Sequence, residues 1–267
     1  MGNINIENIR KKGFAEGTRE EFVENYCRTF ASKHTDGILE LYKKLESSRN
    51  GKYINSDLMK MVFPFYASSP ENRKMYNQSI TNTAAVLTNE AYQRAILNPD
   101  VKRCIFVVGP YGAGKSFFVQ SLFENDEEGL LEESIVYEGS ITPPAFGEKI
   151  QYAMDNGVIP EIIAINPSLE LSMRNIKERA KRIGRDVDKK EVVDKFSGMY
   201  ENLGMIVNEF EGIVYRIYNK KSNAELDLTG GSTDLEDLNY GTKQEISEEY
   251  DTIKKMLEIE SELEEAR

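Results

Sequence analysis

Short apolar runs alternate with amphipathic stretches through the middle of the chain. The apolar runs are rich in Ile and Val and predict strands, at residues 103–109, 134–140, 161–166 and 212–219. The stretches between and beside them repeat apolar residues at helical spacing and predict helices, at residues 115–124, 145–156, 168–183 and 189–210. Strands that alternate with helices in this way predict an α/β fold, in which helices cover both faces of a mostly parallel sheet.

The region before this alternation has a helical pattern with one short strand. Residues 1–50 predict two or three short amphipathic helices, and a turn and a strand ending near Asp57 follow. A long helix is then expected from Pro70 to Leu97, with Ser69 as its cap. A strand and a helix therefore precede the alternating region.

The carboxyl-terminal residues change character after the motif TGGSTD at 229–234. The stretch TKQEISEEYDTIKKMLEIESELEEAR is strongly charged and has a helical pattern, which predicts a solvated or partner-facing helix. We therefore expect an amino-terminal helical segment at 1–50, an α/β domain at 51–230 and an acidic helical tail at 231–267.

Composition narrows the classes of function. The 267 residues carry a net charge of -11, from 45 acidic and 34 basic side chains, which disfavours a nucleic-acid partner. Cys27 and Cys104 lie far apart, so neither a disulfide scaffold nor a zinc site is expected. No stretch reaches the ~18 apolar residues of a membrane span, so we expect a cytoplasmic protein without a membrane partner. The single histidine, His34, falls in a polar helical stretch, which argues against histidine-based catalysis.

A phosphate-binding loop is the clearest chemical motif. The loop reads G-x-x-x-x-G-K-S between an expected strand and an expected helix, and comprises Gly109, Pro110, Tyr111, Gly112, Ala113, Gly114, Lys115 and Ser116. Its backbone N–H groups would meet phosphate oxygens, Lys115 would neutralise the β- and γ-phosphates, and the Ser116 hydroxyl would coordinate magnesium. The motif predicts binding of ATP or GTP with Mg²⁺. A chance glycine turn is the alternative, and the flanking strand and helix argue against it.

Other polar residues gather where the expected strands end. These are Asn55 to Asp57, Glu138 to Ser140, and Asn166. Ligands of open parallel sheets bind at the carboxyl ends of the strands. The three groups and the loop would therefore lie together at that end of the sheet, which we call the rim. Each group taken alone could equally be a helix cap or a turn.

A cluster of basic residues follows in the stretch RNIKERAKRIGRDV. It contains Arg174, Lys177, Arg179, Lys181, Arg182 and Arg185. Ion pairs at i, i+4 on a solvated helix face would explain most of these charges. Arginines also stabilise the γ-phosphate in the transition state of phosphoryl transfer, and we assign that role to one or two of them.

Four stretches together resemble the zeta-toxin family, the P-loop kinases of bacterial toxin–antitoxin systems. They are YINSDLMKMVFPFY, LTNEAYQRAI, IVYEGS and ELSMRNIKERAKRIGRDV, within residues 50–220. The resemblance implies a doubly wound, P-loop NTPase-like fold. It also implies catalytic roles for Asp57 as general base, Lys115 on the donor, and Arg179 and Arg185 on the transferred phosphate. The residues that it places near the acceptor are Asn55, Lys60, Glu90, Glu138 and Ser140.

The resemblance implies transfer of the γ-phosphate to a sugar hydroxyl of UDP-N-acetylglucosamine, and an antitoxin protein as partner. Two features depart from the family: the aspartate strand and its helix precede the loop instead of following it, and Ser140 replaces a threonine. A rewired sheet can keep the same rim if its crossovers stay right-handed.

Two other functions, and two roles for residues 1–50, therefore stay open. The first is a kinase for another acceptor, such as a nucleoside, a dinucleotide or an antibiotic. The second is a nucleotide-dependent interaction protein without catalysis. Residues 1–50 either dock over the nucleotide site in the manner of an antitoxin or simply cover apolar surface.

Overall fold

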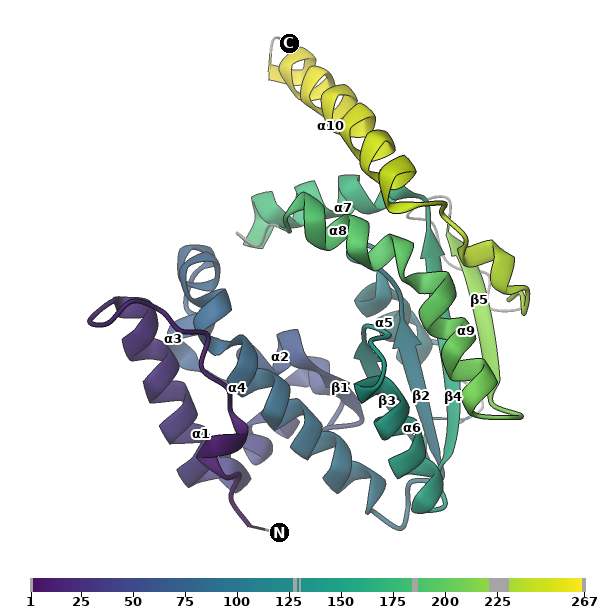
Figure 1. Cartoon of the computed structure of the whole chain (residues 1–267). Helices are drawn as coiled ribbons and strands as arrows, with labels where there is room; N and C mark the ends of the chain where they lie inside the picture. The colour runs from purple at the N-terminus through teal and green to yellow at the C-terminus, as the bar shows by residue number, and fades with distance from the viewer. Residues whose placement is uncertain (1, 127–128, 130, 184–186, 221–230, 266–267) are drawn as a thin grey trace.

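The computed structural model describes residues 2–126, 129, 131–183, 187–220 and 231–265 (Figure 1). A five-stranded, all-parallel sheet has the order β1-β3-β2-β4-β5. Its strands are β1 (Tyr53–Asn55), β2 (Arg103–Val108), β3 (Ser134–Gly139), β4 (Ile159–Pro167) and β5 (Val214–Lys220). The predicted α/β class with a parallel sheet is confirmed.

The register of the sheet brings the ends of β1, β2 and β3 close to one level, while β4 continues to Pro167 and pairs there with Lys220 of β5. Val108, the last residue of β2, lies opposite Gly139 of β3 and Ala164 of β4. Asn55, the last residue of β1, lies opposite Glu138. The chain that leaves β2 and the chain that leaves β1 therefore emerge on the same rim, with the end of β3 between them.

Helices cover both faces of the sheet (Figure 1). Alternate residues of β2 point to opposite sides: Phe106 packs with α4 (Pro70–Ile96), α6 (Ala145–Asp155) and α9 (Met199–Glu209), whereas Val107 packs with α5 (Lys115–Glu124). This alternation follows from the two-residue period of a strand buried on both faces.

The amino-terminal segment folds mainly into two helical stretches that meet at a kink and together form α1 (Arg19–Lys44), consistent with the lower count expected from the sequence. This helix has 26 residues and a single non-helical residue, His34, with φ -131° and ψ 30°. Cys27 and Ala31 before the kink and Ile38 after it are all buried. Both halves of α1 therefore contribute to the cluster that packs on α4.

Short elements connect α1 to the sheet and to α4. They are the 3-10 turns η1 (Ile6–Asn8) and η2 (Glu46–Ser48), and the helices α2 (Ser56–Lys60) and α3 (Pro64–Ala67). One hydrophobic cluster runs from Ile4 to Leu87 and includes all of these helices. The boundary expected at residue 50 therefore falls inside a shared core.

One expectation about the last third needs correction. The helix expected over 189–210 is two helices, α8 (Lys189–Ser197) and α9, which meet at Gly198. Gly198 is a weak helix former, and the two pieces bury their apolar faces in different places: α8 against α10 (Lys243–Glu265) and α9 against the sheet. α10, expected as a solvated or partner-facing helix, is exposed over most of its length, and it also buries Ile246 and Leu257 against α7 (Leu169–Ile183) and α8.

A final 3-10 turn, η3 (Leu235–Leu238), packs on α9. In the part of the chain that the structure describes, no helix is both long and apolar enough to cross a bilayer.

Candidate functional site

The glycine-rich loop joins β2 to α5 and needs glycine at two positions. Gly112 and Gly114 have φ angles of 74° and 82°, in the left-handed region that other residues enter only with strain. A Cβ atom on Gly112 would lie 2.3 Å from the carbonyl oxygen of Ser172, at the start of α7. The loop backbone and α7 are therefore in direct contact, and a side chain at Gly112 would separate them.

The loop ends at the amino terminus of α5, where Gly114 offers no side chain to cap the helix. The first N–H groups of an uncapped helix point outward and attract anions. The Lys115 ammonium lies over the loop and donates to the carbonyl oxygens of Gly109 and Pro110, at 3.0 Å each. A positive charge thus lies beside the uncapped helix end, as a phosphate site requires.

An open cavity of about 460 Å³ lies against this loop, and we call it the donor cavity. It is lined by Gly112, Ala113, Gly114, Lys115, Ser116, Phe117, Glu138, Asn175, Glu178, Arg179, Arg182 and Lys220. Four of these side chains are cationic and two are acidic. In a chain with a net charge of -11, this local excess of positive charge is suited to a polyanion.

The basic cluster on α7 divides into two groups. Arg174 forms ion pairs with Glu170 at 2.9 Å and with Glu260 of α10 at 2.7 Å. Lys177 donates to the carbonyl oxygen of Leu257, also in α10, at 2.7 Å. Lys181 pairs with Glu178 at 3.2 Å.

Arg174 and Lys177 thus join α7 to α10, and Lys181 pairs with an exposed neighbour on α7, whereas Arg179 and Arg182 line the donor cavity. Asn175 fixes α7 against the loop, because its side-chain amide donates to the carbonyl oxygen of Gly112 at 2.8 Å. Arg185, the second arginine predicted at the transferred phosphate, lies outside the described residues.

A chain of hydrogen bonds crosses the rim from the loop to β1. The hydroxyls of Ser116 and Tyr53 both donate to the same carboxylate oxygen of Glu138, that of Ser116 at 2.9 Å. The Asn55 side-chain amide then donates to the Tyr53 oxygen at 3.1 Å. Burial, reinforced by the charge of Glu138, holds the pKa of Tyr53 well above its ordinary value, so this hydroxyl stays protonated as a donor. Ser116, Glu138 and Asn55 are thus brought together as the sequence predicts.

A second cavity of about 610 Å³ lies on the β1 side of Ser116, and we call it the acceptor cavity. It is lined by Glu46, Ser47, Arg49, Tyr53, Asn55, Asp57, Leu58, Met61, Ser116, Val119, Gln120, Phe123 and Glu124. Ser116 belongs to both cavities. The two cavities therefore meet at the residue that the motif assigns to magnesium.

Asp57 opens onto the acceptor cavity from the first turn of α2. The expected strand ends two residues earlier, at Asn55, whose side-chain oxygen accepts from the backbone N–H groups of Asp57 and Leu58 at 2.7 and 2.9 Å. This cap turns the chain into a helix and directs Asp57, with 41% of its side chain exposed, to the cavity. Lys60 is buried behind it, 3.4 Å from the carboxylate, and donates to Asn77 at 2.8 Å.

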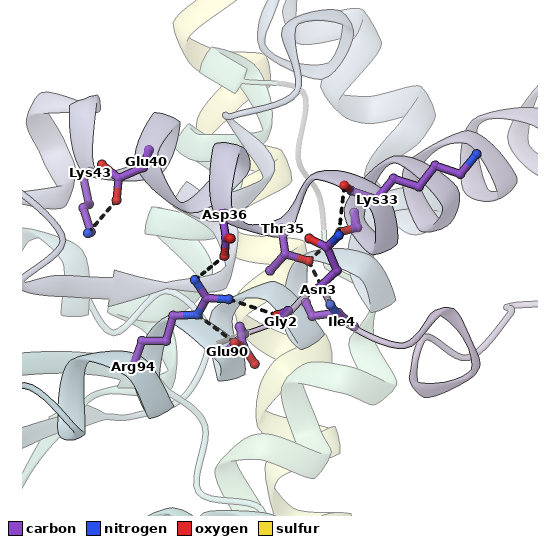
Figure 2. A network of polar contacts seen from close by, with 11 residues as sticks. Gly2, Asn3, Ile4, Lys33, Thr35, Asp36, Glu40, Lys43, Glu90 and Arg94 are labelled. Carbon is purple, nitrogen blue, oxygen red and sulfur yellow. Dashed lines mark hydrogen bonds and ion pairs between the residues drawn. The ribbon is translucent and has the colours of Figure 1, made fainter.

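Glu90 does not reach the rim. Its carboxylate accepts from Arg94 at 2.7 Å, and the same guanidinium donates to Asp36 at 2.6 Å and to the carbonyl oxygen of Gly2 at 3.3 Å (Figure 2). These contacts join α4 to α1 and to the irregular segment at the amino terminus. Glu90 is among the lining residues of neither cavity, and its predicted place at the acceptor needs correction.

Two more polar residues at strand ends differ from the expected rim. Ser140 is exposed just after β3 and lines neither of the two cavities. Asn166 is buried at the end of β4, where it donates to Asn219 and to the carbonyl oxygen of Asp237 and accepts from Tyr240. Asn166 therefore joins β4, β5 and η3, and its role is structural.

The amino-terminal segment does not cover the loop. Of the described residues that line the donor cavity, none precedes Gly112. Residues 46–49 instead form part of the wall of the acceptor cavity, and α1 buries its apolar face against α4. The structural interpretation of residues 1–50 is therefore favoured over occlusion of the nucleotide site.

The sequence interpretation missed two side chains of the site, Tyr53 and Lys220. Lys220 is the last residue of β5 and lines the donor cavity, so the rule that ligands lie at strand ends could have identified it. Tyr53 reads as an ordinary apolar strand residue, and only its pairing register places its hydroxyl beside Glu138.

The oxygen ligands at the rim fit a magnesium ion bound together with a nucleotide better than a metal ion held by the protein alone. Within the described ranges, no cluster of three or more His, Cys, Asp and Glu side chains could hold a metal. Mg²⁺ is often held by one or two protein oxygens together with phosphates and water, and Ser116 beside Glu138 offers such oxygens. Comparison with models of known protein families and with curated proteins gives no match.

Proposed function

We propose that this protein is a phosphotransferase with a P-loop NTPase-like fold, which moves the γ-phosphate of ATP or GTP to a hydroxyl group of a small molecule. The observation that carries the proposal is the meeting of the two cavities at Ser116. Lys115 and the loop lie on one side of that residue, and Asp57 lies on the other. A donor phosphate and an acceptor hydroxyl bound in these cavities would approach each other there.

Binding of the donor would rest on charge and on backbone geometry. The N–H groups of the loop and the side chains of Lys115, Arg179 and Arg182 would bind the phosphates, and their positive charge would stabilise the transferring group. Ser116 and Glu138 would hold the magnesium ion, which when bound neutralises charge on the phosphate oxygens.

On the acceptor side, Asp57 would act as general base. The acceptor oxygen forms a bond to the γ-phosphorus while the bond from that phosphorus to the nucleoside diphosphate breaks and leaves its electron pair on the diphosphate. The hydroxyl proton passes to the Asp57 carboxylate. Lys60 and the Asn55 cap would orient Asp57, since both contact it and both are buried.

The chemical class of the acceptor has two candidates. The resemblance to zeta toxins supports a nucleotide-sugar such as UDP-N-acetylglucosamine. Among the described residues that line it, however, the acceptor cavity presents three carboxylates, Glu46, Asp57 and Glu124, and a single cation, Arg49. This balance favours a neutral or amine-bearing acceptor, such as a nucleoside or an antibiotic, over a molecule with a diphosphate.

The proposal can be tested with the full chain, Mg²⁺, labelled ATP and a metabolite extract. Mass spectrometry should reveal an acceptor that has gained one phosphoryl group, and UDP-N-acetylglucosamine and amine-bearing antibiotics are then assayed singly. Asp57→Asn should abolish the transfer but keep ATP binding. The matched control is Asp100→Asn, an exposed aspartate outside both cavities, which should transfer phosphate at the wild-type rate. Equal rates for the two variants would exclude Asp57 as the base.

A further inference from the structure

Lys220 is a buried lysine whose ammonium lies at the phosphate loop. Its residue surface is only 4% exposed, and it ends β5, next to β4 and on the far side of β4 from β2 (Figure 1). The side chain extends to α5, where Nζ lies 5.3 Å from the centroid of the Phe117 ring. A Cβ atom on Gly114 would lie 2.5 Å from the same nitrogen. The ammonium therefore occupies the space that any side chain at Gly114 would fill.

No acidic side chain of the described residues pairs with this ammonium. Among the described residues, no carboxylate or carbonyl oxygen is hydrogen-bonded to Nζ of Lys220, although Glu138 and Glu178 line the same cavity, and its aromatic contact is the Phe117 ring. The buried Lys60 is different, because it meets both Asp57 and Asn77. Burial also lowers the pKa of Lys220, as expected of a cation without a partner.

A buried charge without a partner is unfavourable for the folded chain unless another molecule supplies the counter-charge. The Lys220 ammonium lines the donor cavity together with Lys115, Arg179 and Arg182. The two lysines reach the loop from different elements: Lys115 from the loop and α5, and Lys220 from the end of β5. An anion that enters the cavity would meet both.

We propose that Lys220 is a second phosphate-binding lysine, which contacts the phosphate chain of the donor nucleotide from the β5 side and favours nucleotides with several phosphates. This proposal rests on the proposed function, because it takes the donor cavity to be a nucleotide site. It also assigns a second purpose to Gly114, whose missing side chain leaves room for the ammonium as well as permitting φ of 82°.

The test compares binding of ATP, ADP and adenosine, each with Mg²⁺, to the full chain and to Lys220→Met. Methionine keeps an unbranched apolar stem and removes the charge. We expect the affinity for ATP and ADP to fall about 10- to 100-fold, which corresponds to about 1.4–2.8 kcal/mol, while the affinity for adenosine stays unchanged. Lys220→Arg should recover part of the loss, because it restores the positive charge.

Stability separates a binding role from a structural one. Removal of a buried charge without a partner should leave the urea midpoint of the nucleotide-free protein unchanged or higher. The matched control Lys60→Met removes a buried lysine that has partners and should lower that midpoint. Wild-type ATP affinity in Lys220→Met, or a lowered midpoint together with weaker binding of all three ligands, would overturn the proposal.

Lys115→Met distinguishes this proposal from the proposed function. If Lys115→Met loses ATP binding and Lys220→Met does not, the nucleotide site stands and only the role of Lys220 fails. If Lys115→Met binds ATP as tightly as the wild type, the donor cavity is not the nucleotide site and both proposals fail.

Discussion

Gly112→Ala should test the contact between the phosphate loop and α7 more sharply than any other single change. The new methyl group would lie 2.3 Å from the Ser172 carbonyl oxygen and 2.9 Å from the Cα atom of the same residue. Both are backbone atoms, so α7 or the loop has to move. The left-handed backbone adds about 1–2 kcal/mol of strain, and the overpacking adds about 1–3 kcal/mol.

Gly157→Ala is the matched control. Gly157 has the same φ of 74°, but a Cβ atom there meets nothing within 4 Å. Both variants carry the backbone strain and the same loss of freedom in the unfolded chain, so the difference between them isolates the clash. That difference, about 1–3 kcal/mol, corresponds to roughly 2–12 °C in Tm for a chain of this size.

The two variants are compared by urea unfolding and by binding of Mg-ATP. Gly112→Ala should be the less stable, and it should also lose nucleotide affinity, because α7 carries Arg179 and Arg182 into the donor cavity. Gly157→Ala should bind nucleotide as the wild type does. Equal losses of stability, or full nucleotide affinity in Gly112→Ala, would refute the inference that loop and helix are locked together.

Three further outcomes are expected. Glu90→Gln should keep phosphate transfer close to the wild-type rate, since Glu90 pairs with Arg94 away from both cavities; loss of transfer with intact nucleotide binding would return it to the site. The ion pairs of α10 should weaken in acid. Cations of α7 and α8 hold the pKa values of Glu260 and Asp251 below their ordinary range. The stabilisation that these two ion pairs give to the folded state is therefore complete above about pH 4.5 and is lost as the pH falls through the lowered pKa values. Amide exchange of α10, corrected for intrinsic rates, should therefore accelerate between about pH 5 and pH 3, and unchanged protection would contradict it. Cys27 and Cys104 should resist thiol reagents until the chain unfolds, because burial raises the pKa of Cys27 to about 12 and that of Cys104 well above its ordinary value; fast labelling of the native protein would show that the core opens.

Local signals predicted the central elements closely. Ser69 and Pro70 mark the start of α4, and its observed end at Ile96 is one residue from the predicted one. The glycine-rich loop joins β2 to α5, and Lys115 and Ser116 are the first two residues of α5, as the motif requires. In each case the determining interactions lie within a few residues of the position that they fix, and a sequence pattern can therefore report them.

Other features depend on partners that are distant in the sequence. The two halves of α1 on either side of the kink at His34 pack on α4, and the break at Gly198 reflects two different packing surfaces. The Asn55 cap is local and is one of the two roles that the sequence allows for this group, a cap or a turn. Tyr53 and Lys220 enter the site through strand order and register, which the pattern of a single strand does not contain.

The place of β1 at the edge of the sheet also has a consequence for the growing chain. Its one strand neighbour in the described sheet is β3, and Asn55 pairs with Glu138, which is 83 residues later. At about 5–20 residues per second, a ribosome needs roughly 4–17 s to make that interval. During this time the exposed edge of β1 is only three residues long, too short to attract another strand strongly. The helices that precede and follow β1 can meanwhile pack together through α1 and α4, so the helix that carries Asp57 can be in place before the glycine-rich loop has been synthesised.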